Sequence, residues 1–254
     1  MAAEQQLISV TSGVPIGPYL IKDNGINEVW DDNLGYKIDI SYPSFNSNKN
    51  KTISLELNAY FLGRAIKTLS ELRHEKIEEY NSTGEEWFTD LKNEYSESFA
   101  IAYASKNILS ISLTLFMYSS GATHGNFAFE TLNFDTRNTL IKIRLDDLFK
   151  ADCNYLERIS ELTIKQLCRE YWEKTREEAD EDTIEWFRDG ASPDIVNFEN
   201  FLITDKGLTF LFPPYQVGAY VMGTWTVEIP YFELRDLFRS NGPYSYLNDD
   251  EEDY

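Results

Sequence analysis

The sequence is poor in the side chains that most often bind metals or act as catalytic bases, with two histidines and two cysteines in 254 residues. Cys153 and Cys168 would lie about 22 Å apart on a single helix, which is too far for a disulfide. Two thiols without a nearby histidine are also a poor zinc site. The sequence has no H-E-x-x-H motif and no EF-hand spacing. We therefore expect no metal and no cofactor, and we interpret both cysteines as structural.

The sequence also lacks the run of roughly 20 apolar residues that a membrane-spanning helix needs. Its first residues, Met1 to Gln6, contain neither the basic nor the apolar region of a signal peptide. The lack of a membrane-spanning run and of a signal peptide is compatible with two cellular locations. The chain is extracytoplasmic, either periplasmic or secreted, if its N-terminus is a mature start; otherwise it is cytosolic.

Basic residues are few compared with acidic ones: 23 against 43, for a formal net charge of −20. Such a surface repels nucleic-acid phosphates, so we expect no nucleic-acid partner. A basic protein partner is favoured, because complementary charge raises the rate of encounter. The alternative interpretation is that the charge only keeps the protein soluble.

Alternation of apolar and polar residues predicts the strands of an antiparallel sheet. Residues 1–25 show no clear period and predict an irregular or edge segment, and Pro43 is expected to end the first clear strand. The expected strands are 36–42, 99–103, 109–117, 127–136, 140–143, 198–204, 208–212 and 225–229.

Helical spacing of apolar residues predicts a long helix over 54–80, a resumption over 85–93, a helical region from 145 toward Trp172 and a short helix over 231–238. The long helix is predicted from the spacing of Leu55, Leu62, Ile66, Leu69 and Ile77. Because strands and helices come in blocks, the fold class expected is α+β.

Three parts follow from this order of elements. We expect residues 1–105 to form an N-terminal subdomain with a strand and the long helix, and residues 106–240 to form a C-terminal domain. Residues 241–254 include five acids after position 248, which predicts an acidic, disordered tail.

The loop between the strands at 109–117 and 127–136 contains Ser119, Ser120 and His124. A serine and a histidine can form a nucleophile and its base. However, no G-x-S-x-G elbow accompanies them, and the glycines of the loop also suit a simple hairpin turn with His124 as a hydrogen-bonding residue. The hairpin interpretation is favoured.

Two short acidic segments have simple structural explanations. Asp146 and Asp147 could act as paired carboxylates, but their position before Leu148 fits the N-terminus of a helix better. Residues 177–182 contain five acids and could bind a cation weakly. A solvated helix end or loop explains them better.

The loop after the strand at 208–212 opens with Pro213 and Pro214, which have no N–H groups and cannot continue a ladder. It then presents Tyr215 and Tyr220 between two strands. Exposed tyrosine is favoured at interfaces because it gives a large contact area with few rotatable bonds. The alternative is a rigid crossover whose tyrosines pack on the core.

Several segments together resemble the RsiV-like family. They are residues 119–125 (SSGATHG), 133–135 (NFD), 143–149 (IRLDDLF) and the block from Phe212 to Leu234, with a Tyr42-Pro43 strand end before the long helix. The resemblance covers roughly residues 30–240. Thr123 departs from the pattern, as an insertion where the family commonly has Gly-Ala-His.

The resemblance implies an α+β fold and a non-catalytic binding function. The family includes the extracytoplasmic part of the anti-sigma factor RsiV, which recognises lysozyme, and accessory domains of PdaC-type peptidoglycan deacetylases. A secreted mycobacterial antigen is related in fold. By resemblance, the loops at Ser119 to His124 and Pro213 to Tyr215 would approach the cleft of a lysozyme-like partner.

The first hypothesis is therefore a binding protein, not an enzyme, that recognises a basic wall-active protein such as lysozyme or a toxin, as inhibitor, immunity protein or sensor. Its partner-binding residues would be Ser119, Ser120, His124, Pro213, Pro214, Tyr215 and Tyr220. The alternative is a module that binds peptidoglycan or another carbohydrate, or an accessory domain of a wall-modifying enzyme.

Overall fold

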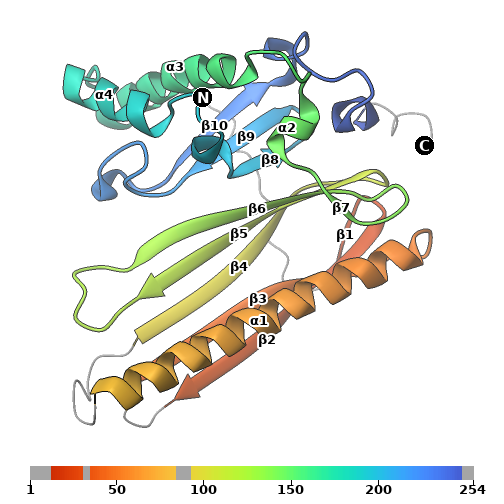
Figure 1. Cartoon of the computed structure of the whole chain (residues 1–254), viewed down its shortest axis with the longest axis vertical. Coiled ribbons are helices and arrows are strands. Elements are labelled where there is room, and N and C mark those ends of the chain that lie inside the picture. The colour runs from red at the N-terminus through yellow and green to blue at the C-terminus, as the bar shows by residue number, and fades with distance from the viewer. Residues whose placement is uncertain (1–12, 31–34, 84–92, 248–254) are drawn as a thin grey trace. The chain divides into compact units, whose positions relative to one another are not determined.

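The computed structural model describes residues 13–30, 35–83 and 93–247. The chain divides into two compact units, and it passes between them within strands β4 (Asn93–Ala104), β5 (Ile108–Tyr118) and β6 (Asn126–Asp135). Unit 1 comprises residues 1–100, 113–128 and 138–140; unit 2 comprises 101–112, 129–137 and 141–254. The mixture of helices and mainly antiparallel strands confirms the α+β fold class (Figure 1).

Unit 1 begins with three strands, β1 (Val14–Ile16), β2 (Tyr19–Trp30) and β3 (Tyr36–Asn46), which pair antiparallel in chain order. The helix α1 (Lys51–Thr83) then connects β3 to β4, and these two strands are parallel. The sheet was predicted to be antiparallel, and this one ladder differs because a helical crossover returns the chain in the same direction.

The N-terminal strand β2 was not predicted. It pairs with β3 from Leu20 to Trp30, although Asp23, Asn24 and Asn27 interrupt its apolar pattern. Tyr19 and Ile21 are its buried anchors. Backbone pairing with β3 therefore defines this strand more than side-chain alternation does.

The prediction that Pro43 ends its strand was wrong, because β3 continues to Asn46. The ladder with β4 stops at Ile40, so beyond that point one edge of β3 carries no neighbouring strand among the described residues. Phe45 turns its N–H and C=O to the side chain of Asn58 on α1, at 2.7 and 3.0 Å. Pro43 shares the orientation of Phe45, so its missing N–H costs the sheet no hydrogen bond.

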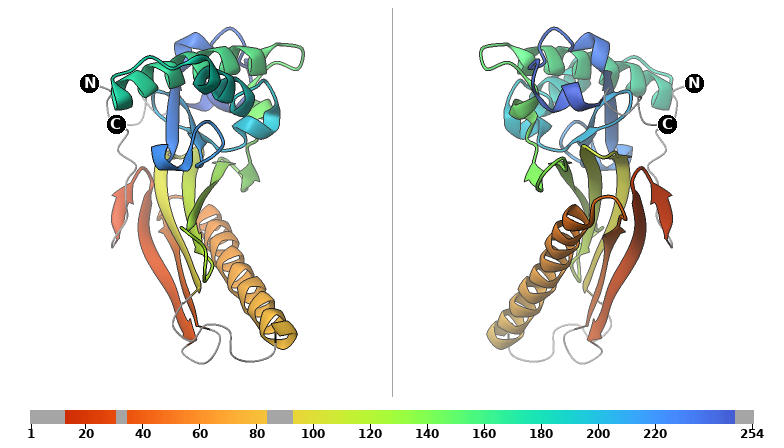
Figure 2. Two further views of the ribbon diagram at one scale, coloured as in Figure 1. Left: turned by 90° about the vertical axis from the view of Figure 1, so that its left-hand side faces the viewer. Right: turned by 90° about the vertical axis from the view of Figure 1, so that its right-hand side faces the viewer.

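The helix α1 lies along one face of the strands of unit 1 (Figure 2), and it buries a different stripe from the predicted one. The buried side chains are Ile53, Leu57, Phe61, Ala65 and Leu69. Of the residues from which the helix was predicted, Leu55, Leu62, Ile66 and Ile77 are exposed.

A buried ion pair also joins α1 to the sheet. Arg64 pairs with the buried carboxylate of Glu97 in β4, and this carboxylate also accepts a hydrogen bond from the Tyr95 hydroxyl at 3.0 Å.

Unit 2 contains a second, three-stranded antiparallel sheet in the order β10 (Trp225–Pro230), β9 (Gly207–Phe212), β8 (Phe201–Ile203). The helices α3 (Tyr155–Thr175) and α4 (Glu181–Gly190) lie together above it, and α3 contacts β10 (Figure 1). The strands predicted over 198–204 and 208–212 are confirmed as β8 and β9, with β8 shorter than expected because residue 198 belongs to the 3₁₀ helix η1 (Ile195–Phe198).

Two side chains from β5 and β6 close the free edge of β8 by hydrogen bonding. Asn133 donates from Nδ2 to the Phe201 carbonyl at 2.8 Å, and its Oδ1 accepts from the Ile203 N–H at 3.2 Å. Ser110 Oγ donates to Asn133 Oδ1 at 2.6 Å and accepts from the same N–H at 3.0 Å. All of these groups are buried, so this cluster satisfies an edge that water cannot reach.

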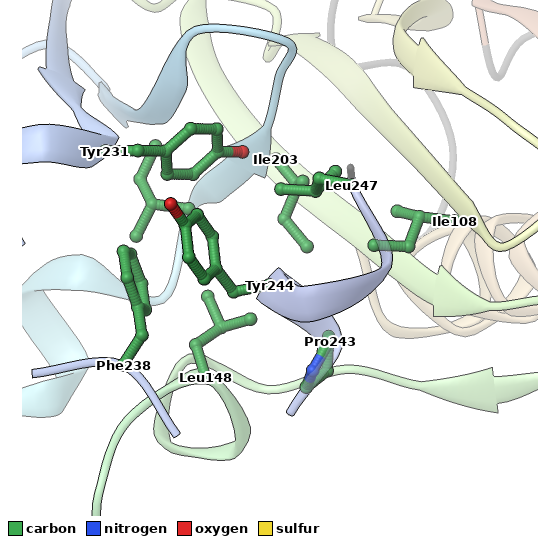
Figure 3. A pocket seen from close by; sticks show the side chains of 9 residues that line it. Ile108, Leu148, Ile203, Tyr231, Phe238, Pro243, Tyr244 and Leu247 are labelled. Atoms are coloured by element: carbon green, nitrogen blue, oxygen red, sulfur yellow. The ribbon is translucent and has the colours of Figure 1, made fainter. Parts of the chain in front are cut away.

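The end of the described chain packs on the core of unit 2. The helix predicted over 231–238 is only the 3₁₀ helix η3 (Tyr231–Glu233), which follows Pro230. Residues 243–246, placed by the sequence in the tail, form the 3₁₀ helix η4 (Pro243–Tyr246). Tyr244 stacks on Phe238 with ring centroids 4.3 Å apart, and Leu247 lines the same apolar pocket (Figure 3).

The remaining predictions concern smaller features. Both cysteines are free thiols. The predicted helical segment 85–93 lies almost wholly outside the described residues, as does the end of the acidic tail from 248. Across the described part of the chain, no helix has both the length and the apolar character that crossing a membrane demands.

Candidate functional site: an aromatic surface on unit 2

The loop from Pro213 to Gly223 is held in one conformation by its own backbone. It begins where β9 ends at Phe212, as the two prolines require. The Tyr215 N–H donates to the Gly218 carbonyl at 3.0 Å, and Tyr215 adopts φ of +73°. A left-handed conformation is rare for a tyrosine, and here it turns the side chain outward, with 52% of the residue exposed.

Two neighbouring residues, Gln216 and Val217, anchor the loop to the body of unit 2. Gln216 donates from Nε2 to the carbonyls of Gly190 and Asn197, each at 3.0 Å. Val217 is fully buried. The anchors tie the loop to the end of α4 and to η1, so Tyr215 is displayed from a fixed base.

Trp186 on α4 is joined to the tyrosine loop by a hydrogen bond. Its Nε1 donates to the Tyr215 carbonyl at 3.1 Å, and the rings of Tyr215 and Tyr220 lie 5.6 Å apart at an angle of 33°. Val221, next to Tyr220, is 88% exposed. We call the set Trp186, Tyr215, Tyr220 and Val221 the aromatic surface.

Trp186 was missed by the sequence analysis, although a signal was present. Trp186 and Phe187 are neighbours on α4, so their side chains point about 100° apart around the helix. Phe187 is buried, whereas Trp186 is 39% exposed. Because the two side chains lie at different angles around the helix, a narrow buried stripe that includes Phe187 leaves Trp186 at its margin.

Behind this loop, a lysine on α3 packs on a buried indole. Lys174 Nζ lies 3.7 Å from the centroid of the Trp225 ring, and it approaches the Met222 carbonyl at 3.5 Å. Trp225 Nε1 is buried without a hydrogen-bond partner. Burial lowers the pKa of Lys174, and the charge of Glu170 one turn earlier opposes that shift.

Glu170 is the acid of this region whose charge is most strongly disfavoured. Burial raises its pKa to about 7, Glu173 adds to the shift, and Lys174 and Arg169 oppose it. The folded state therefore binds a proton more tightly than the unfolded state does. The stability that this proton contributes is fully present below about pH 4.5 and is lost as the pH rises through about 7.

We expect Glu170→Gln to stabilise the protein at pH 8 by on the order of 1 kcal/mol, because the neutral amide avoids burying a charge in a partly solvated place. At pH 4.5 the difference from the wild type should disappear. Urea unfolding at both pH values checks this. Glu161→Gln on the same helix, whose side chain is 74% exposed, is the control and should behave like the wild type at both; equal effects of the two variants would refute the assignment.

The predicted residues of the other loop lie in unit 1, whereas the aromatic surface lies in unit 2. Ser119 is exposed and Ser120 is half-buried. Ser120 Oγ has no hydrogen-bond partner, while its N–H donates to Asn93 Oδ1 at 2.7 Å. His124 Nδ1 lies 3.0 Å from the Gly125 carbonyl. The structure therefore forms no hydrogen bond between Ser120 and His124, and this loop has the geometry of a hairpin turn.

The two acidic segments cap helices, as the favoured interpretation predicted. Asp147 Oδ2 accepts from the Arg144 N–H at 2.8 Å at the start of α2 (Leu145–Leu148). Asp180 Oδ1 accepts from the Thr183 N–H at 2.9 Å at the start of α4. Among the described residues, no cluster of three or more histidine, cysteine or acidic side chains has the geometry of a metal site.

Two family models match separate parts of this chain. Residues 31–127 match "Deacetylase PdaC", and residues 146–232 match "Protein of unknown function (DUF3298)". The aromatic surface lies within the second match, and the loop from Ser119 to His124 lies within the first. The resemblance to RsiV itself stays a prediction.

One curated relative is similar over most of the chain. The chain is 24% identical over 200 residues to the peptidoglycan-N-acetylmuramic acid deacetylase PdaC of Bacillus subtilis, covering 79% of this chain and 38% of that protein. It thus spans about two fifths of the length of this relative.

A crystal structure of a DUF3298 family member from Bacteroides fragilis has a TM-score of 0.66 at 21% identity, over 93% of this chain and 100% of that one. One from Pseudomonas aeruginosa has a TM-score of 0.55 at 11% identity, over 90% and 97%. At these identities the two structures show a shared fold.

Proposed function

We propose that this chain is a non-catalytic, extracytoplasmic module that binds cell-wall glycan through the aromatic surface of unit 2. The observation that carries the proposal is that surface itself: Trp186, Tyr215 and Tyr220 lie together on an anchored loop and helix. The name of the curated relative, a peptidoglycan-N-acetylmuramic acid deacetylase, supports a wall polymer as the ligand. Because the chain corresponds to about two fifths of that relative, an accessory role beside a catalytic part fits it.

The chemistry of the surface suits a sugar chain. The C–H face of a pyranose ring is apolar and stacks on aromatic rings, while the hydroxyls at its rim bond to polar tips such as the tyrosine O–H. Aromatic side chains that are already held in place lose little conformational entropy when a ligand binds, which favours binding. The hydrogen bond from Trp186 to the Tyr215 backbone helps to hold this surface in place.

Binding to purified peptidoglycan sacculi tests the proposal. We expect Trp186→Ala and Tyr215→Ala each to weaken binding by roughly two- to tenfold, since one aromatic contact contributes about 0.5–1.5 kcal/mol and 1.4 kcal/mol is a factor of ten. The matched control is Trp172→Ala, which removes another exposed tryptophan, 49% exposed on α3, and should leave binding unchanged. Equal losses in all three variants, or no binding by the wild type, would refute the glycan site.

A second candidate function is recognition of a basic, wall-active protein such as lysozyme, and the net charge of −20 favours it. On unit 2 it would use the loop at Pro213 to Tyr220. The two candidates differ in their response to salt. Binding to a basic protein should weaken steeply between 50 and 500 mM NaCl, roughly as surface charges become screened, whereas stacking on glycan should persist.

A further inference from the structure

A groove opens in unit 2 at the point where β7 (Ile141–Lys142) separates from β6. The two strands pair only at Phe134–Lys142 and Asp135–Ile141, and the Ile143 N–H then donates to the Asn133 carbonyl at 2.7 Å. Beyond this bond the chain turns into α2. The space left beside β6 has a volume of about 620 Å³, and η1 and the start of β8 form its far wall.

The floor of this groove is an unpaired strand edge. Asn133 directs its backbone groups toward β7, and residues two apart in a strand direct theirs to the same side. Thr131 and Phe129 therefore face the edge that β7 has left. Both residues line the groove, and no described strand pairs with β6 beside them. An unpaired edge with room beside it can accept one more strand.

Five charged side chains line the groove: the basic Lys142 and Arg144, and the acidic Glu130, Asp146 and Glu199. Lys142 and Arg144 stand two residues apart in an extended stretch, so they share one side of it, and both are exposed. Arg144 is partly neutralised by Asp146 and Asp147, at 3.6 and 3.7 Å. Lys142 forms no ion pair among the described residues, so its ammonium group is available to a ligand.

The opposite wall presents Glu199, which is exposed and forms no ion pair within the described part of the chain. Its backbone is fixed, because the Thr131 hydroxyl donates to the Glu199 carbonyl at 3.3 Å. The backbone of Glu199 is therefore held in place, while its carboxylate remains free to bind a cationic group of a ligand. An anion would be attracted to one side of the groove and a cation to the other.

We propose that this groove binds an extended polypeptide segment that adds as a strand to the edge of β6 and carries neighbouring acidic and basic side chains. The acidic side chain would pair with Lys142 and the basic one with Glu199. The volume is within the range of roughly 300–1,000 Å³ typical of ligand sites. This interaction goes beyond glycan binding and does not depend on the aromatic surface.

Selection from a random twelve-residue peptide library, followed by fluorescence anisotropy with the selected peptide, tests the proposal. We expect the peptides to carry adjacent opposite charges. Lys142→Glu should weaken binding at least tenfold, and reversing the charge of the peptide's acidic residue should restore it. The control Lys165→Glu makes the same change of charge on an exposed part of α3 and should leave binding unchanged.

Backbone methylation of the peptide separates strand addition from simple charge attraction. An N-methyl group on a residue that faces β6 should abolish binding, and one on the next residue should be tolerated, because only alternate N–H groups face the partner strand. The proposal is overturned if no peptide binds the wild type better than Lys142→Glu, or if every position tolerates methylation.

Discussion

Replacing Asn133 with alanine is expected to lower the free energy of unfolding by about 3 kcal/mol. The substitution leaves the Phe201 carbonyl without its donor and removes the acceptor of the Ser110 hydroxyl, both in a buried place. An unsatisfied buried polar group costs roughly 1–3 kcal/mol. The Ile203 N–H keeps Ser110 as a partner, so the loss falls mainly on the other two groups.

Three variants measured by urea unfolding separate the hydrogen bonds from the loss of volume. Asn133→Asp keeps the size of the side chain but cannot donate to the Phe201 carbonyl, and it buries a charge, so it should destabilise at least as much as alanine. Ser110→Ala should cost less, about 1 kcal/mol, because Asn133 still accepts from Ile203. Asn126→Ala, at an exposed position of β6, should stay within about 0.5 kcal/mol of the wild type. A loss below 1 kcal/mol for Asn133→Ala would contradict the role given to this cluster.

Asn133 also illustrates what a sequence pattern can and cannot say. Asn133 belongs to the NFD segment that contributed to the family resemblance, but the resemblance assigned no role to this residue. In the structure its side chain hydrogen-bonds to the backbone of β8, at the edge of the three-stranded sheet. Its partners Phe201 and Ile203 lie 68 and 70 residues away, which is beyond the reach of any local pattern.

The fold was predictable where side-chain alternation was regular, as in β5 and β10. The fold was harder to predict where one sequence pattern was compatible with two different buried faces. The helix α1 carries two apolar stripes, and only contact with the sheet decides that Phe61 is buried while Leu62 is exposed. The strand β2 has few apolar residues and depends on its ladder with β3, so local alternation could not predict it.

The candidate site was predictable in part. Two adjacent prolines and the spacing of tyrosines indicated the display loop, and Tyr215 is indeed exposed. Trp186 comes from a helix 29 residues away, and its contact with the loop depends on how α4 ends. No sequence pattern indicated a role for Gly190 at the end of α4. Its missing Cβ allows the loop to pack closely against this end of the helix.

Gly190→Ala is expected to destabilise unit 2 by about 3 kcal/mol and to displace the loop that carries Tyr215. A Cβ at position 190 would lie 1.9 Å from the Gln216 carbonyl oxygen and 3.0 Å from Val217 Cγ1. Backbone atoms cannot yield as a flexible side chain can, so the loop has to move away from α4. That movement breaks the bonds of Gln216 to Gly190 and Asn197 and unseats the buried Val217.

The same substitution at Gly63 provides the matched control with the opposite sign. Gly63 lies within α1, and a Cβ there would meet no atom within 4 Å. Alanine is favoured over glycine inside a helix by roughly 0.5–1 kcal/mol, so Gly63→Ala should stabilise. Urea unfolding followed by tryptophan fluorescence measures both variants. If Gly190→Ala were as stable as the wild type, with unchanged tryptophan emission, the loop would not be seated against α4, and the rigid aromatic surface would lose its physical basis.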